Sequence, residues 1–71
     1  MERQPVNSSA IASIGYDSSN GTLEIEFANG GPVWQYYDFP EYKWNEFQYC
    51  DSHGKYFHAN IKDQYRDGRI G

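Results

Sequence analysis

The chain has 71 residues, a formal net charge of −4 and a high aromatic content of 18%. This length allows one small domain, and the negative charge disfavours a general nucleic-acid binder, since such proteins neutralise phosphates with Lys and Arg. A single cysteine excludes an intramolecular disulfide, and no apolar run is long enough for a signal peptide or a membrane span. We therefore expect a soluble cytoplasmic protein, without membrane contact, whose small core depends on aromatic side chains.

The N-terminal residues differ in pattern from the rest of the chain. Residues 1–9 are polar and show no periodicity, which predicts a flexible arm before a single domain over residues 10–70. Apolar and polar residues then alternate on both sides of Asn20-Gly21, a pair that favours a hairpin turn. With these two residues as the loop, Tyr16 is expected opposite Ile25, and the apolar residues of both strands share one face.

A second turn over residues 28–32 precedes a third strand, and two registers are open. A two-residue Asn29-Gly30 loop turns Trp34 and Tyr36 toward the core, whereas a three-residue loop that includes Gly31 turns both rings outward. The two large rings on one face favour the inward register.

Two short helices are expected after the third strand. Pro40 suits the first helical position, and each of the segments 41–50 and 55–65 carries one apolar stripe. The stripes consist of Trp44, Phe47 and Cys50 in the first segment and of Phe57, Ile61 and Tyr65 in the second. The predicted fold is α+β: a three-stranded antiparallel meander followed by two helices packed on one face.

Two motifs resemble those of the KTSC domain family, which occurs at the C-terminus of some lysyl-tRNA synthetases and as stand-alone bacterial and phage proteins. Its Tyr-x-Tyr motif is similar to Trp34-Gln35-Tyr36, and its Ser-x-Gly-x-Tyr-Phe-Asn motif is similar to residues 52–58, followed by Ile61 and Tyr65. Trp34 replaces the usual Tyr and His58 the usual Asn, so no role that rests on that hydroxyl or that amide is carried over.

The resemblance implies a binding domain without catalytic activity, since the family has no assigned reaction, and RNA binding has been suggested from its attachment to a tRNA synthetase. Aromatic rings that stack on bases, with Lys and Arg on phosphates, are the usual means of holding single-stranded RNA. Candidate contacts to RNA or a nucleotide-containing ligand are Tyr37, Lys55, Tyr56, His58, Lys62, Arg66 and Arg69. The motif residues expected in the core are Trp34, Tyr36, Phe57 and Ile61.

No catalytic, cofactor or metal site is predicted. Cys50 lies on an apolar stripe, where cysteine is usually a buried hydrophobic residue, and with His53 and His58 it gives one ligand fewer than a structural zinc site takes. Glu24 and Glu26 alternate on a polar strand face, which indicates a solvated sheet surface or the protection of a sheet edge.

A protein partner is the alternative to RNA. Small acidic domains of phage or prophage type often bind a host protein or sequester a nucleotide-like signal. Exposed tyrosines on an acidic surface suit a protein interface. The candidates are Tyr37, Tyr42 and Tyr49. The outer face and edges of the sheet also suit a homodimer.

Overall fold

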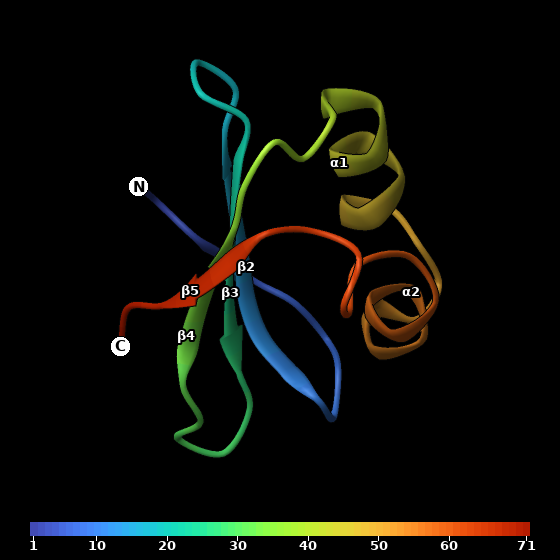
Figure 1. Cartoon of the computed structure of the whole chain (residues 1–71). Helices are drawn as coiled ribbons and strands as arrows, with labels where there is room; N and C mark the ends of the chain where they lie inside the picture. Colours follow the sequence, from blue (N-terminus) through green and yellow to red (C-terminus); the bar gives the residue numbers. More distant parts are fainter.

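The computed structural model describes all 71 residues, which form one five-stranded antiparallel sheet with two helices against one face (Figure 1). The elements are β1 (Gln4–Pro5), β2 (Ile11–Asp17), β3 (Thr22–Phe27), β4 (Val33–Tyr36), α1 (Glu41–Gln48), α2 (His53–Asn60) and β5 (Asp67–Arg69). Strand order in the sheet follows the chain, from β1 to β5. The predicted α+β class is confirmed. Neither helix is long and apolar enough to cross a lipid bilayer.

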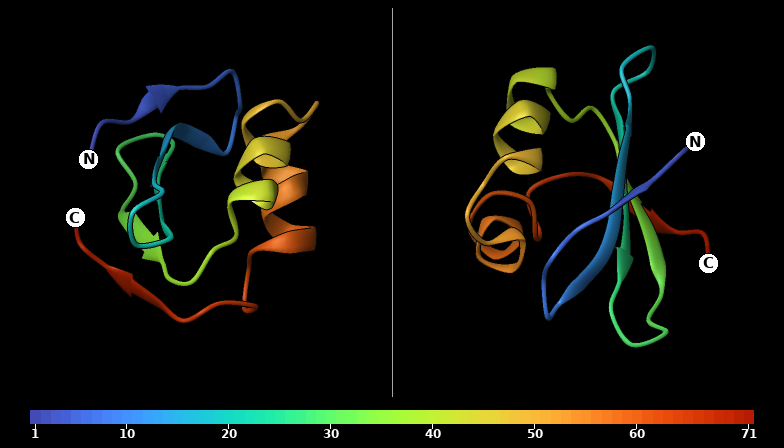
Figure 2. Two further views of the ribbon diagram at one scale, coloured as in Figure 1. Left: turned by 90° about the horizontal axis from the view of Figure 1, so that it is seen from above. Right: turned by 180° about the vertical axis from the view of Figure 1, so that it is seen from behind.

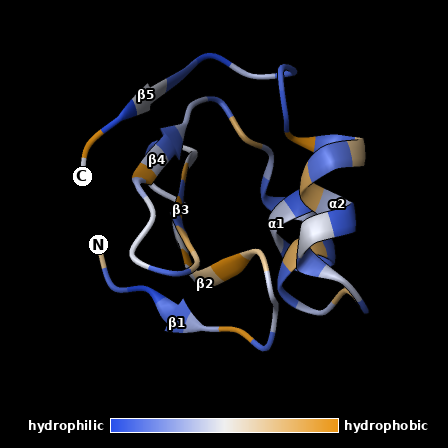
Figure 3. Ribbon diagram, turned by 90° about the horizontal axis from the view of Figure 1, so that it is seen from below, coloured by the Kyte–Doolittle hydropathy of each residue, from blue (hydrophilic) through white to orange (hydrophobic).

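The sheet has two more strands than the predicted meander. β1 lies in the segment predicted as a flexible arm, where Gln4 pairs with Ile14. β5 follows the point where the second helix was expected to end, and its Gly68 pairs with Gln35. Both strands are short and hydrophilic (Figure 3), so neither has the alternating apolar pattern by which strands are recognised in a sequence.

The β2–β3 register differs from the prediction by two residues. Tyr16 lies opposite Leu23 instead of Ile25, because residues 18–21 form a four-residue loop. The Asp17 carboxylate accepts hydrogen bonds from the backbone amide and the hydroxyl of Ser19, which stabilises the longer loop. Since strand side chains alternate with period two, this shift leaves every residue on its predicted face.

The β3–β4 turn takes the two-residue form. Asn29 and Gly30 both have positive φ, 62° and 73°, as in a type I′ turn. Trp34 therefore lies opposite Ile25 and Tyr36 opposite Leu23. Both rings are on the face that the helices cover, which is the inward register.

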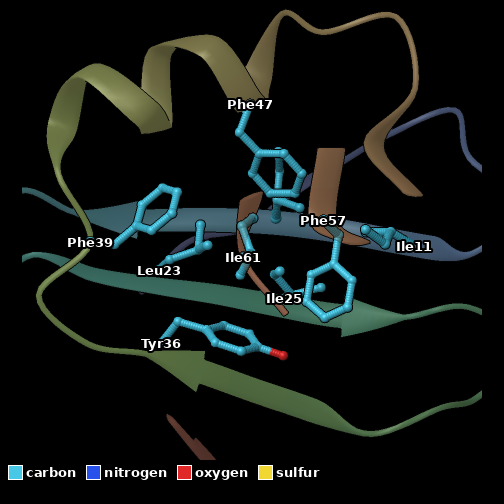
Figure 4. Close-up of a cluster of buried hydrophobic side chains, with 9 residues drawn as sticks. Ile11, Leu23, Ile25, Tyr36, Phe39, Phe47, Phe57 and Ile61 are labelled. Atoms are coloured by element: carbon cyan, nitrogen blue, oxygen red, sulfur yellow. The ribbon is translucent and has the colours of Figure 1, made fainter. Parts of the chain in front are cut away.

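The core lies between this face and the helices. It contains nine buried hydrophobic residues: Ile11, Ile14, Leu23, Ile25, Tyr36, Phe39, Phe47, Phe57 and Ile61. Figure 4 shows aromatic rings from both layers meeting over the aliphatic side chains of β2 and β3. Trp34 is only partly buried and packs at the margin of the core.

Both helices have different limits from those predicted. Pro40 is the residue before α1 instead of its first residue, and α1 ends two residues earlier than expected. α2 begins earlier than expected, because the Ser52 hydroxyl accepts a hydrogen bond from the Lys55 amide at the helix N-terminus. It ends at Asn60, so Tyr65 lies beyond the helix and packs on Phe39, with ring centroids 5.0 Å apart.

The opposite face of the sheet carries a partly buried ion pair. Glu24, predicted as part of a solvated surface, has a side chain only 6% exposed and pairs with Arg3 from the N-terminal segment, which is 29% exposed. The Arg3 Nε also donates to the Ser13 hydroxyl, and the Gln35 amide donates to the second Glu24 oxygen. Figure 2 shows both chain termini on this side of the sheet, away from the helices. The N-terminal segment thus covers Glu24 and supplies its counter-charge.

The β3–β4 turn gives a first prediction. A Cβ at Gly30 meets no atom within 4 Å, so Gly30→Ala is expected to destabilise the fold through its positive φ alone, by about 1–2 kcal/mol. Gly54→Ala is the control, since that glycine has an ordinary helical φ and its added Cβ makes only van der Waals contact. Urea unfolding of both variants measures the difference, and an unchanged Gly30→Ala midpoint would contradict the assigned turn.

The ion pair gives a second prediction. Arg3→Ala leaves the buried Glu24 carboxylate without its partner, and because Arg3 is partly exposed we expect a loss of about 2–3 kcal/mol, below the loss for a fully buried pair. Arg66→Ala is the matched control, because its pair with Asp38 is 77% and 85% exposed and is expected to contribute nothing measurable. Equal unfolding free energies for the two variants would show that the N-terminal segment does not stabilise the sheet.

Candidate functional site: an aromatic pocket

One open pocket, with a volume of about 230 Å³, lies where the sheet meets the segment after α2. Its walls come from β3, β4, α2, the turn that follows α2, and the start of β5. The lining residues are Phe27, Trp34, Tyr36, Phe57, Lys62, Asp63 and Asp67.

Aromatic rings form the apolar walls of the pocket. The Phe57 ring meets the rings of Phe27 and Tyr36 edge to face, at centroid distances of 5.3 and 5.8 Å. Trp34 and Tyr36 join them because residues two apart on a strand share a face. The Tyr36 and Phe57 rings belong to the core and Phe27 packs against it, while Trp34 stays partly exposed at the pocket.

Tyr36 brings a hydroxyl group to the pocket. The residue is 4% exposed, and burial, followed by the charges of Asp67 and Asp63, raises the pKa of its hydroxyl to about 12. The hydroxyl is therefore neutral at physiological pH, and both carboxylates lie near enough to act on it.

Three charged side chains line the pocket together with these rings. Lys62, Asp63 and Asp67 are exposed, and none of them takes part in either of the two ion pairs of the structure. The pocket thus has two carboxylates against one ammonium group, all free to meet a ligand.

The sequence-based candidates for RNA contacts do not gather at this pocket. Of the seven, only Lys62 lines it. Tyr56 is engaged inside the fold: its hydroxyl donates to the Glu46 carboxylate at 2.7 Å and its ring stacks on Phe47, which links the two helices. Burial and then the bond to Glu46 raise the Tyr56 pKa.

Tyr37 and Arg66 form a separate pair. The Tyr37 hydroxyl donates to the Gln35 side-chain oxygen at 3.2 Å, on the face away from the helices. The Arg66 guanidinium lies 5.6 Å from the Tyr37 ring centroid and 3.6 Å from the Asp38 carboxylate. The Tyr37 hydroxyl is therefore engaged within the chain, whereas the Arg66 side chain remains largely exposed.

The remaining candidates are exposed at separate places. Lys55 and His58 lie on α2. Arg69 lies on β5 opposite Trp34, where its Nε donates to the carbonyl of Gly71. Among the tyrosines proposed for a protein interface, Tyr42 and Tyr49 are strongly exposed and Tyr37 is partly buried.

Cys50 and His53 both pack against Phe47. The Cys50 thiol donates to the Phe47 carbonyl at 3.1 Å, and burial raises the pKa of the thiol. The His53 ring lies 5.5 Å from the Phe47 ring, edge to face. Since a catalytic thiol needs a lowered pKa, the surroundings of Cys50 suit a structural role.

Sequence reasoning did not identify Phe27, Asp63 and Asp67 as site residues. Phe27 was recognisable only as an apolar strand residue. The two aspartates lie in the turn after α2 and at the start of β5, and neither element was predicted with these limits. The signal that could have pointed to the site was the proximity of both carboxylates to Lys62 in the sequence.

The small α+β fold, with the Trp34-Gln35-Tyr36 motif of β4 at its pocket, is the arrangement expected of a KTSC domain. The KTSC domain family model matches residues 7–65, and the chain belongs to this family. Its structure is similar to the crystal structure of a KTSC domain protein from Yersinia pestis, with a TM-score of 0.93, 43% identity, and coverage of 99% of this chain and 97% of the other.

Two bacterial relatives also match over nearly the whole chain. An uncharacterized protein of Stutzerimonas stutzeri is 35% identical over 71 residues, which are 99% of each chain. A protein of Tsukamurella paurometabola is 33% identical over 63 residues, which are 89% of this chain and 92% of the relative. The family resemblance inferred from the motifs is confirmed.

The Tyr36 hydroxyl gives a third prediction. Its folded-state pKa of about 12 lies above the ordinary value of 10.0, so between these pH values the hydroxyl ionises in the unfolded chain before it does so in the folded chain, and the fold loses stability as the pH rises from 10 toward 12. Tyr36→Phe should therefore lose less stability than the parent chain over this range, measured by urea unfolding at each pH. At pH 7 the same change should leave stability nearly unaltered.

Tyr16→Phe is the control at pH 7. The Tyr16 hydroxyl donates to the Phe39 carbonyl at 2.5 Å, so its removal should cost about 1 kcal/mol. If Tyr36→Phe shows the same alkaline loss as the parent chain, Tyr36 does not titrate as described.

Proposed function

We propose that this chain is a non-enzymatic binding domain that takes one side chain of a protein partner into the aromatic pocket. The observation that carries this proposal is the pocket itself: partly exposed Trp34 and buried Tyr36 and Phe57 form apolar walls beside three unpaired charges. Concave apolar sites with a few polar groups are the usual form of ligand sites.

The size of the pocket favours a single side chain. Sites for drug-sized ligands occupy roughly 300–1,000 Å³, whereas this pocket has about 230 Å³. A group held there would leave the rest of its molecule outside, in contact with the surrounding surface. A segment of a protein meets this condition, since one side chain can enter while the backbone stays at the mouth.

The charges favour a protein over RNA as the partner. Phosphate binding draws its affinity from clustered Lys and Arg, and here the four basic candidates are divided between α2, the pocket mouth, the Tyr37 ring and β5. Two carboxylates beside the rings would repel a phosphate. The protein-partner hypothesis from the acidic, tyrosine-rich composition is therefore the one that we develop.

The absence of catalysis is part of the proposal. The polar groups at the pocket are a hydroxyl with a pKa of about 12, one lysine and two exposed carboxylates. A nucleophile needs activation by a base or by a lowered pKa, and the hydroxyl of Tyr36 has a raised one.

The test compares the partner proteins that are captured by a variant with a blocked pocket and by a control variant. Asp67→Arg places a long cationic side chain at the mouth and should abolish capture of partner proteins from a bacterial lysate. Asp51→Arg, an equal change of charge on an exposed residue that does not line the pocket, should leave capture intact. The captured proteins are identified by mass spectrometry, with and without nuclease.

Three results decide between the hypotheses. Proteins that depend on an open pocket and survive nuclease support the proposal. Identical capture by the two variants would rule out binding through the pocket. Capture that is lost on nuclease treatment, and also in a Lys62→Ala, Arg66→Ala double variant, would support RNA instead.

A further inference from the structure

We propose that the side chain taken into the pocket is cationic, an arginine or lysine presented by an exposed basic segment of the partner protein. This inference rests on the proposed function and names the chemistry of the group that the pocket holds.

The ring faces are the first reason. An aromatic ring carries negative charge on its face, so a cation within about 6 Å of its centroid is attracted, most strongly by Trp. Trp34, Tyr36, Phe27 and Phe57 line one small pocket, and Trp34 is the ring that remains partly exposed there. A cation in the pocket is attracted by each ring face that it reaches, whereas an anion would be repelled by the same faces.

The carboxylates are the second reason, and they are independent of the rings. Asp63 and Asp67 line the pocket without an ion-pair partner in the chain. Lys62 offsets only one of these two charges, so the mouth keeps a negative excess. Charge complementarity therefore selects a positive group, and the planar guanidinium of arginine both stacks on rings and pairs with carboxylates.

The Tyr36 hydroxyl is the third reason. Tyr36 lines the pocket, and its hydroxyl, with a pKa of about 12, is neutral at physiological pH, so it can accept a hydrogen bond from an ammonium or guanidinium group. Rings, hydroxyl and carboxylates together provide the contacts of an arginine or lysine side chain: an apolar surface for the methylene groups and acceptors for the charged end.

The probes are three blocked peptides, Gly-Gly-Arg-Gly-Gly and its versions with Lys or Gln in the middle, and a hexauridine RNA. The readout is the indole N–H signal of Trp34 in ¹H–¹⁵N NMR spectra. Trp44 is an internal reference, because its ring stacks on Tyr16, 5.4 Å away, and does not line the pocket. The Arg and Lys peptides should shift the Trp34 signal in a saturable manner, and the Gln peptide should not.

Charge-neutral variants test the role of the carboxylates. Asp63→Asn with Asp67→Asn should weaken binding of the Arg peptide by about tenfold, the scale of one or two cation contacts. Asparagine tolerates the positive φ of 61° at position 63 as aspartate does. The matched control, Glu41→Gln with Asp51→Asn, changes the net charge equally at exposed positions that do not line the pocket and should bind like the parent chain.

The outcomes separate the inference from the function beneath it. If the Gln peptide shifts Trp34 as strongly as the Arg peptide, the pocket binds a side chain but the cation assignment is wrong. If only hexauridine shifts Trp34, both the cation assignment and the protein partner are wrong. Equal weakening by both double variants would show a general charge effect and would also overturn the assignment. If no probe moves Trp34 and Asp67→Arg captures the same proteins as Asp51→Arg, the proposed function itself fails.

Discussion

The register of the β3–β4 hairpin is the constraint on which the rest of the structure depends. It is set by two residues, Asn29 and Gly30, whose positive φ values allow a two-residue loop whose twist matches that of the strands. With this loop Trp34 and Tyr36 face the helices, and Tyr36 meets Phe57. A loop one residue longer would turn both rings to the other face, and neither the core nor the pocket could form as observed.

The same register organises the opposite face of the sheet. It places Gln35 opposite Glu24, where the amide of one donates to the carboxylate of the other. Arg3 then completes the environment of Glu24 from the N-terminal segment. A buried carboxylate is costly without partners, so this face couples the first residues of the chain to its central strand. The two faces differ in chemistry, with rings and aliphatic groups under the helices and a hydrogen-bonded ion pair on the far side.

The sequence predicted those parts of the fold that have strong local signals. The α+β class, the central strands and their faces followed from alternation and turn residues, and the family from the resemblance of two motifs. β1 and β5 were missed because two or three polar residues paired at a sheet edge have no periodicity of their own. The pocket could be anticipated only in part: Trp34 and Tyr36 were visible as a motif, whereas Asp67 joins them through a strand that becomes apparent only in three dimensions. The basic residues predicted to contact RNA lie apart from one another in the structure. Their spacing in the chain does not indicate which ring or carboxylate each one meets.

The Trp34-Gln35-Tyr36 motif therefore has two roles in this chain. It closes the core and forms a wall of an acidic, aromatic pocket. The central claim is that the inward register creates both. Side-chain NOE measurements test it most directly, because the Tyr36 and Phe57 ring centroids lie 5.8 Å apart, while Tyr37 lies on the other face, beside Gly68. NOEs are expected between the rings of Tyr36 and Phe57, and between Tyr37 and Gly68. NOEs from the Tyr37 ring to Phe57, with none from Tyr36, would contradict the inward register.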